Sequence, residues 1–266
     1  MKTGEAAQLF LNSCKAKGLS PRTIQWYGDI LRQFVFRYPK LPRKPMQIEE
    51  FIASCKGGDE RKHGYYRTLR RFFRFLRRHY KVKNPMELVD PPRRMAKLPR
   101  VLTPDELDQL LSFPHKAKIK ASLLFLADTG ARLGELARLN PGDISQNHVG
   151  YIAKVNGKTG FRYVPISWDT CNALVNYLPL GWTTDWLGRL ISTAFDDAYV
   201  VGTAHTLRHT FATLWKGDEF ALQRIMGHST IVTTVRYRHL RTEQLIEQHN
   251  QYSPLRMVFT ATRSML

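Results

Sequence analysis

The feature that most constrains the fold of this 266-residue chain is a proline-rich run, residues 84–100, with the sequence NPMELVDPPRRMAKLPR. Proline fixes φ and lacks a backbone N–H, so prolines this dense cannot lie within one continuous helix. The run therefore divides a chain whose length is comfortable for two domains. We predict one domain over residues 1–90, a basic linker over residues 91–100 and a second domain over residues 101–266.

Positive charge is concentrated in the first part of the chain. Residues 1–100 hold 24 Lys and Arg against 8 Asp and Glu, whereas residues 101–266 hold 17 against 14. The net charges are +16 and +3, and the total of +19 favours a polyanionic partner, most simply nucleic acid. We expect the first hundred residues to supply most of the attraction, while the second part performs another task.

Cysteine usage and hydropathy favour an intracellular protein. The chain has three cysteines, Cys14, Cys55 and Cys171, an odd number without metal-ligand spacing, which fits free thiols in a reducing cytosol. The N-terminus carries Glu5 and lacks the apolar run of a signal peptide, and no stretch approaches the length of a membrane span. We expect a cytoplasmic, nucleoid-associated protein without a membrane partner.

Apolar residues at helical spacing predict four helices in the first ninety residues, beginning near Thr3, Pro21, Pro45 and Asp59. In the fourth, DERKHGYYRTLRRFFRFLRRHYK, one face is apolar and aromatic and another is almost entirely cationic. Like charges at this spacing repel, and a phosphate backbone would relieve the repulsion; the alternative is a solvated face. The arginines predicted to contact DNA, from this helix and the linker, are Arg67, Arg70, Arg71, Arg74, Arg77, Arg78, Arg93 and Arg94.

The second part combines helical segments with one β-hairpin. LTPDELDQLL has a capping box from Thr103 to Glu106, and ASLLFLADTGARLGELARL is helix-forming but broken at Gly130. GYIAKVNGKTGFRYVPI alternates about a turn that carries Lys158, and helices resume after Trp168. The predicted fold class is mainly α, an α+β arrangement in which an all-helical N-terminal domain precedes a mostly helical domain with a small antiparallel sheet.

Two histidines in HTLRH, His205 and His209, stand four residues apart and could share one helix face as metal ligands. Zinc proteases require HExxH, and here Thr206 stands where the glutamate belongs. Since no third ligand has a recognised spacing, we predict no metal site.

The same stretch fits a site for a phosphate group. Arg208 carries a permanent charge on a planar fork of donors, which suits phosphate oxygens. His228 can donate a hydrogen bond near neutral pH, and Tyr237 offers a phenolic oxygen that could attack phosphorus. Each residue alone also has an ordinary structural role, but together they supply the parts of a metal-free phosphoryl transfer. The candidate catalytic residues are Arg132, Lys158, His205, Arg208, His228 and Tyr237.

Four motifs in this order resemble those of the tyrosine recombinases, also called the phage integrase family, and the match covers nearly the whole chain. TGARLGELARLNPGDI is similar to the first conserved box, and GKTGFRYVPI to the hairpin that bears the catalytic lysine. HTLRHTFAT is similar to the second box, and MGHSTIVTTVRYRHL to the segment with the last histidine and the nucleophile. The basic N-terminal part resembles the family's core-binding domain, and the second part its catalytic domain.

The resemblance implies a reaction. Tyr237 would attack the scissile phosphate and become linked to the 3′ end of the DNA. Arg132 and Arg208 would hold the non-bridging oxygens and stabilise the transition state. Lys158 would protonate the leaving 5′ oxygen, with Lys154 as the alternative because Thr159 and its neighbours depart from the usual pattern.

The remaining roles concern proton transfer and support. His205 would assist proton transfer at the tyrosine, His228 would donate to a phosphate oxygen, and Glu135 would brace Arg132. His209 is expected to be structural. The phosphotyrosyl bond conserves the energy of the cleaved bond, so rejoining is expected to need no ATP, metal or other cofactor.

The leading prediction is therefore a site-specific DNA recombinase of Xer-like two-domain organisation, active in integration, excision or dimer resolution. It would act on double-stranded DNA as a homotetramer and be a monomer or dimer when free. The alternatives are a type IB topoisomerase-like enzyme that relaxes DNA, and a catalytically silent DNA-binding regulator. The tail, residues 254–266, could dock onto a neighbouring protomer or fold back on its own domain.

Overall fold

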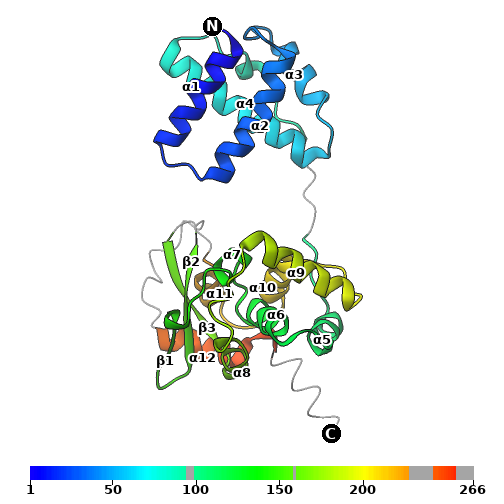
Figure 1. Ribbon diagram of the computed structural model, residues 1–266, viewed down its shortest axis with the longest axis vertical. Helices are drawn as coiled ribbons and strands as arrows, with labels where there is room; N and C mark the ends of the chain where they lie inside the picture. Colours follow the sequence, from blue (N-terminus) through cyan, green and yellow to red (C-terminus); the bar gives the residue numbers. More distant parts are fainter. Residues whose placement is uncertain (94–98, 158–159, 228–241, 256–266) are drawn as a thin grey trace. The chain divides into compact units, whose positions relative to one another are not determined.

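The computed structural model describes residues 1–93, 99–157, 160–227 and 242–255. The chain divides into two compact units, Met1–Lys97 and Leu98–Leu266, each with its own hydrophobic core. Helices dominate both units (Figure 1), and the predicted fold class is confirmed.

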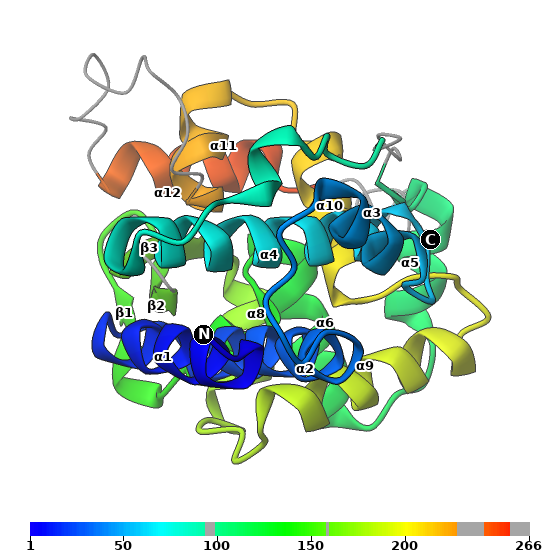
Figure 2. The same ribbon diagram turned by 90° about the horizontal axis from the view of Figure 1, so that it is seen from above.

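The N-terminal unit is built of helices throughout its described part. Its elements in chain order are α1 (Thr3–Ala16), α2 (Pro21–Arg37), α3 (Pro45–Ala53), α4 (Asp59–Tyr80) and η1 (Pro85–Leu88). The α4 helix contacts each of the other three α-helices (Figures 1 and 2), so its apolar face forms the centre of the core. Phe34, Phe72 and Phe73 are fully buried there and pack edge to face.

The C-terminal unit places helices around a three-stranded antiparallel sheet in the order β1-β2-β3. Its elements are α5 (Pro104–Ser112), α6 (Ala117–Thr129), α7 (Leu133–Leu136), η2 (Pro141–Asp143), β1 (Ile144–Gln146), β2 (Tyr151–Gly157), β3 (Gly160–Ile166), α8 (Trp168–Val175), α9 (Thr184–Asp197), α10 (Ala204–Leu214), α11 (Glu219–Met226) and α12 (Thr242–Tyr252). The strands β2 and β3 form the predicted hairpin. The short β1 was not predicted, because three residues are too few to display an alternating pattern.

The buried α6 helix ends at Gly130, where the sequence predicts a break. Gly130 has a φ of 59°, in the left-handed region that favours glycine. A Cβ atom at this position would lie 2.6 Å from Phe211 Cδ1 and 2.9 Å from Met226 Sδ. The end of α10 and the end of α11 therefore pack directly against the turn that leads into α7.

The α12 helix completes the core of the C-terminal unit. Its Leu245 and Ile246 are buried, and the helix contacts β3. Leu255, which follows α12, is buried in the same core. The core thus reaches into the predicted tail, of which residues 256–266 lie outside the described part of the chain.

The three cysteines, Cys14, Cys55 and Cys171, are buried free thiols. Among the residues that the structure describes, no helix is both long and apolar enough to cross a membrane.

Candidate active site

Arg132 occupies the N-cap position of α7, directly after the Gly130 turn. Its backbone N–H donates to Glu135 Oε2 at 2.7 Å, and its Nη1 donates to Glu135 Oε1 at 3.0 Å. The Arg132 side chain is still 43% exposed. One edge of the guanidinium is thus held by the protein, while the remainder is accessible to a ligand.

Arg162 of β3 binds the same carboxylate, and sequence reasoning missed it as a site residue. Its Nη1 and Nη2 donate to the two oxygens of Glu135, the second bond measuring 2.9 Å. Its Nε donates to the Ile225 carbonyl oxygen at 2.7 Å, so it also ties the sheet to α11. Strand alternation could have identified Arg162 as an inward-facing residue. It pairs with the buried Val155, and paired residues share a face of the sheet.

Glu135 is only 1% exposed and yet holds a negative charge. Burial would raise the pKa of its carboxyl group, because it disfavours the charged form. Hydrogen bonds from Arg162 and from the Arg132 backbone N–H, together with the charge of Arg162, outweigh burial and lower the pKa. One ionised carboxylate therefore orients two arginines.

Arg208 lies on α10 and is only 4% exposed. Its Nη1 donates to the Gly130 carbonyl oxygen and its Nη2 to the Met226 carbonyl oxygen, both at 2.6 Å. Burial, followed by the charges of Arg132 and Arg162, lowers the pKa of Arg208 to about 10. The guanidinium thus stays charged at neutral pH and is clamped between two chain turns.

His205 and His209 stand one helical turn apart on α10, with ring centroids 4.9 Å apart in an edge-to-face arrangement. Partial burial of the ring, followed by the charges of His209, Arg208 and Arg132, lowers the pKa of His205 from its ordinary value. The lowered pKa favours the neutral imidazole, the state that can accept a proton. The residue is exposed, while His209 is half-buried.

Lys154 of β2 pairs with Tyr163 and lies with its Nζ 4.5 Å from the centre of the Phe161 ring. Phe161 and Tyr163 are both exposed. Because neighbouring residues of a strand point to opposite faces, Lys154 lies on the face opposite to Val155 and Arg162. The geometry disfavours Lys154 as the alternative to Lys158.

Four predicted residues, Arg94, Lys158, His228 and Tyr237, lie outside the described residues. The residues that directly precede Lys158 and His228 in the sequence are described.

These neighbours are glycines that lie against the arginine cluster. A Cβ atom on Gly157 would be 3.0 Å from Glu135 Oε1 and 4.0 Å from Arg132 Nη1. One on Gly227 would be 2.7 Å from Arg162 Cδ. The residues directly before Lys158 and His228 thus lie beside the cluster that contains Arg132, Arg162 and Glu135.

The described residues contain no group of three or more His, Cys, Asp or Glu side chains that could hold a metal ion. His205 and His209 lie together, as the sequence predicts for a pair of histidines four residues apart, without a third ligand among these residues.

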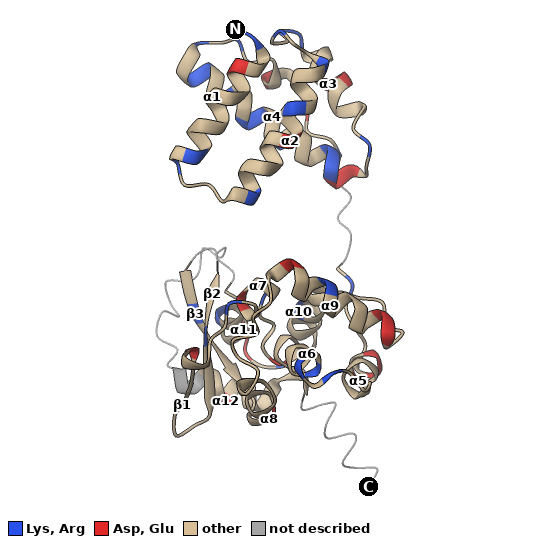
Figure 3. Cartoon of the chain, in the orientation of Figure 1, with Lys and Arg blue, Asp and Glu red and all other residues tan. Residues whose placement is uncertain are grey.

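Basic residues recur along the α4 helix of the N-terminal unit (Figure 3), and their exposed side chains form a cationic surface. The predicted arginines that lie on it, all exposed, are Arg67, Arg70, Arg71, Arg74, Arg77 and Arg78. Some also bind within the unit: Arg71 Nη1 donates to the Tyr27 hydroxyl at 2.6 Å, and Arg77 pairs with Glu87 of η1. Arg93 is exposed as well.

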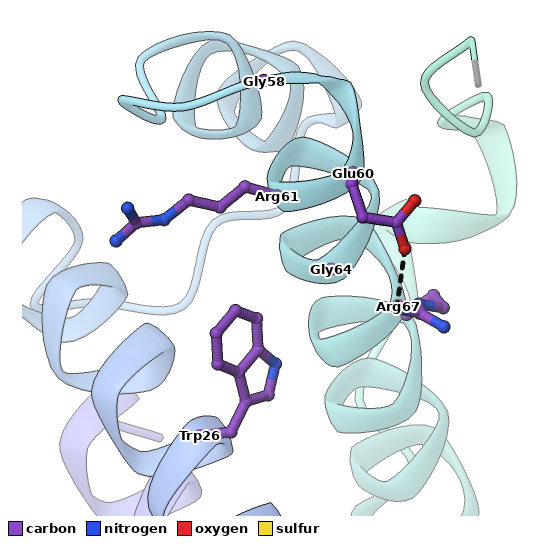
Figure 4. A pocket seen from close by; sticks show the side chains of 6 residues that line it. All are labelled: Trp26, Gly58, Glu60, Arg61, Gly64 and Arg67. Atoms are coloured by element: carbon purple, nitrogen blue, oxygen red, sulfur yellow. Dashed lines mark ion pairs between the residues drawn. The ribbon is translucent and has the colours of Figure 1, made fainter. Parts of the chain in front are cut away.

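An exposed indole lies beside the start of this surface. Trp26 of α2 is 43% exposed and lines a pocket together with residues at the beginning of α4 (Figure 4). A Cβ atom on Gly64 would be only 3.0 Å from Trp26 Cζ2, so the glycine makes room for the ring. Arg61 and Arg67 are the cations of this pocket, and Arg67 lies 3.9 Å from Glu60.

Comparisons with known proteins give the same family as the motifs. Residues 100–187 match the model of the phage integrase family. A tyrosine recombinase XerC from Pelobacter propionicus is 31% identical over 90% of this chain and 91% of its own length. A tyrosine recombinase XerD from Staphylococcus saprophyticus is 30% identical over 90% of this chain and 94% of its own length.

Solved structures show the same fold at lower identity. A lambda integrase dimer bound to a COC′ core site aligns with a TM-score of 0.70 and 16% identity, covering 91% of this chain and 78% of that chain. XerH bound to a palindromic difH substrate, in a post-cleavage complex, aligns with a TM-score of 0.67 and 18% identity, covering 96% and 84%.

The chain belongs to the phage integrase family of tyrosine recombinases, as the motifs predicted. It is a site-specific DNA recombinase, and the similarities favour neither a topoisomerase-like enzyme nor a silent regulator.

Proposed function

We propose that the protein cleaves and rejoins duplex DNA through a 3′-phosphotyrosyl intermediate, with Tyr237 as the nucleophile. The observation that carries the proposal is the binding of Arg132 and Arg162 to one buried carboxylate, Glu135, with Arg208 near enough for the charges of all three to act on it. Such a group of fixed positive charges suits a phosphodiester that gains charge in its transition state.

In the cleavage step, the Tyr237 oxygen bonds to phosphorus while the bond from phosphorus to the 5′ oxygen breaks. Arg132 and Arg208 contact the two non-bridging oxygens. The accessible part of Arg132 and the fixed charge of Arg208 support these roles. Glu135 acts through Arg132, to which it is hydrogen-bonded, and Arg162 acts through Glu135.

Two proton transfers accompany this step. The tyrosine proton passes to His205, whose lowered pKa favours the neutral form that can accept a proton. Lys158 gives a proton to the leaving 5′ oxygen, and His228 donates a hydrogen bond to a phosphate oxygen. The positions of Gly157 and Gly227 beside the arginine cluster support both assignments.

Rejoining reverses these steps with a 5′ hydroxyl from the partner duplex. The phosphotyrosyl bond keeps the energy of the original bond, so the reaction runs without ATP or a metal ion. His209 packs against His205 and takes no direct part.

The N-terminal unit supplies much of the grip on DNA. The eight arginines predicted to contact DNA lie in the N-terminal domain, residues 1–90, and in the linker, residues 91–100. Arg93 and Arg94 are the two in the linker. The catalytic domain, residues 101–266, carries the chemistry. The exposed arginines of α4 and the strong charge of this part of the chain support this division.

The active assembly is a homotetramer on two duplexes, formed from monomers or dimers that bind the recombination site. A lambda integrase tetramer has been solved on a Holliday junction, with a TM-score of 0.71 and 14% identity to this chain. We place the reaction in the cytoplasm, on nucleoid DNA, in integration, excision or dimer resolution.

A covalent-trap experiment tests the proposed nucleophile. The protein is mixed with nicked duplex fragments of its own replicon in the presence of a chelator, quenched with SDS and analysed by mass spectrometry. We expect a protein–DNA adduct on Tyr237 that Tyr237→Phe does not form. The matched control is Tyr199→Phe, since Tyr199 is an 89% exposed tyrosine of the same unit. An adduct formed equally by Tyr237→Phe would reject this nucleophile.

A further inference from the structure

A buried polar cluster joins α12 to α6, apart from the arginine site. The His249 Nε2 lies 2.6 Å from the carbonyl oxygen of Asp128 and 3.1 Å from its Oδ1. The Ser253 hydroxyl donates to Asp128 Oδ1 at 2.8 Å, and the Ser167 backbone N–H donates to Oδ2 at 2.7 Å. Asp128 thus collects partners from α12, from the residue after it and from the N-cap of α8.

The cluster is closed to solvent, so it cannot itself contact DNA. Asp128 and His249 are both 0% exposed. Burial would raise the pKa of Asp128, but His249, Ser167 and Ser253 together lower it, so the carboxylate is ionised. A buried ion pair is costly to desolvate, and replacing the whole pair by apolar side chains of similar volume is often neutral for stability. Its hydrogen bonds are directional, whereas apolar contacts are not, so the cluster can fix the position of α12 relative to α6.

The cluster is continuous with the anchor of Arg208. Asp128 lies two residues before Gly130, whose carbonyl oxygen accepts a bond from Arg208. The His249 ring also stacks against Phe211 of α10, with centroids 6.4 Å apart, and Phe211 packs on Gly130. One short stretch at the end of α6 therefore anchors both α10 and α12.

Both ends of the segment that carries the proposed nucleophile are linked to this stretch, one through Arg208 and the other through α12. Residues 228–241 connect α11 to α12 in the sequence. At the α11 end, the Met226 carbonyl oxygen accepts a bond from Arg208. At the α12 end, His249 and Ser253 bind Asp128.

We propose that Asp128 and His249 are positioning residues that fix α12, and with it the C-terminal attachment of residues 228–241, relative to Arg208. The inference rests on the proposed function, in which Tyr237 of that segment attacks the phosphate held by Arg208. A misplacement of about 1 Å at a reacting group can reduce a rate about 100-fold, so the register of α12 matters for cleavage.

Apolar packing supplies the other attachment of α12. Leu245 and Ile246 are buried in the core. Loss of the polar cluster should therefore leave α12 associated with the unit but free to shift along or rotate on its apolar face.

The test compares variants of the full-length protein on nicked duplex fragments that bear its recombination site. His249→Leu removes the donor and keeps an apolar volume, whereas His249→Gln keeps an N–H donor at a similar reach. Ser253→Ala is a milder second variant that removes one bond to Asp128. The matched control is Leu110→Ala, a fully buried position in α5 of the same core. Amide hydrogen exchange over residues 245–252 reports how firmly α12 is held.

We expect His249→Leu to slow adduct formation on the order of tenfold or more. DNA affinity should be unchanged, exchange in α12 should be faster, and His249→Gln should restore much of both signals. Ser253→Ala should give a smaller effect in the same direction. Leu110→Ala should lower the melting temperature without slowing adduct formation at 25 °C.

Faster exchange in α12 with a wild-type rate of adduct formation would overturn the proposal, as would an equal loss of rate in Leu110→Ala. The proposed nucleophile is judged separately, from Tyr237→Phe. If that variant loses adducts while His249→Leu keeps the wild-type rate, the positioning role alone is rejected.

Discussion

Glu135 is the residue on which the arrangement of the site depends most. Its carboxylate accepts bonds from the side chain and the backbone of Arg132 and from both terminal nitrogens of Arg162. The resemblance to the family suggested a brace for Arg132. The second arginine was not predicted, because which charged side chains share one buried carboxylate depends on the approach of β3 to α7.

Removing the Glu135 carboxylate should destabilise the C-terminal unit. Glu135→Ala would leave Arg132 and Arg162 without their shared counterion, and loss of one partner of a buried pair costs about 3 kcal/mol. We expect a reduction of this size in the free energy of unfolding by urea, together with loss of cleavage. Glu106→Gln is the control, since Glu106 binds Arg100 at the surface and should cost less than about 1 kcal/mol. Equal costs for the two variants would contradict this account.

The same carboxylates should control stability in acid. The pKa of Glu135 and that of Asp128 are lower in the folded protein than their ordinary values. Such groups stabilise the fold above their unfolded pKa, and this contribution is lost as the pH falls through the folded pKa. We expect the urea concentration at the midpoint of unfolding to decrease when the pH is lowered below about 4.5. In Glu135→Gln the fall should be shallower than in the wild-type protein; an identical pH dependence would rule out Glu135 as a contributor.

Among the secondary-structure elements, α4 has two roles, one in the core of the N-terminal unit and one on its surface. Its aromatic face fills the core of the N-terminal unit, and its arginines cover the exposed face. Some of this charge is engaged within the unit, since Arg71 donates to the Tyr27 hydroxyl and Arg77 pairs with Glu87. Sequence spacing predicted the two faces, but it could not predict that η1 folds back against one of them.

The cationic face should determine the salt dependence of DNA binding. Each phosphate neutralised contributes about 0.9 to the slope of log affinity against log salt, so the double variant Arg74→Ala with Arg78→Ala should lower that slope by about 1.8. The control is Lys15→Ala with Lys17→Ala, which removes the same charge near the end of α1. Fluorescence anisotropy over a range of salt concentrations measures both. An unchanged slope in the α4 variant would exclude these arginines from phosphate contact.

At the scale of the whole molecule, the chain builds two separate cores, and the second extends beyond α12. Leu255 is buried in that core, so the docking segment proposed for residues 254–266 cannot include it without disrupting the C-terminal unit. A tail available to a neighbouring protomer therefore begins after this residue.

Deleting residues 256–266 should thus leave the fold and DNA binding intact. If the tail docks onto a neighbouring protomer, strand exchange between two duplexes should fall at least tenfold, while adduct formation on a single nicked site should change little. Melting temperature, anisotropy and recombination products measured on one preparation separate these effects. Full recombination by the shortened protein would reject docking in trans, and a large drop in melting temperature would instead indicate a tail that folds on its own unit.

Most of the architecture was predictable because it depends on local chemistry. Proline density separated the two units, periodic apolar residues marked the helices, and the glycine break at Gly130 placed Arg132 at a helix start. Short elements were not predictable in this way, since β1 and η1 have only three and four residues, too few to establish a repeating pattern.

The sequence alone specified the residue types of the site, their order and the charge that attracts DNA. It did so because the family's motifs are short, local patterns and charge is additive. Only the tertiary structure decided which groups meet: Arg162 at Glu135, Arg208 at the Gly130 turn, and His249 at Asp128. These contacts join residues 27 or more positions apart, and their geometry follows from how helices and strands pack, which spacing along the chain does not specify.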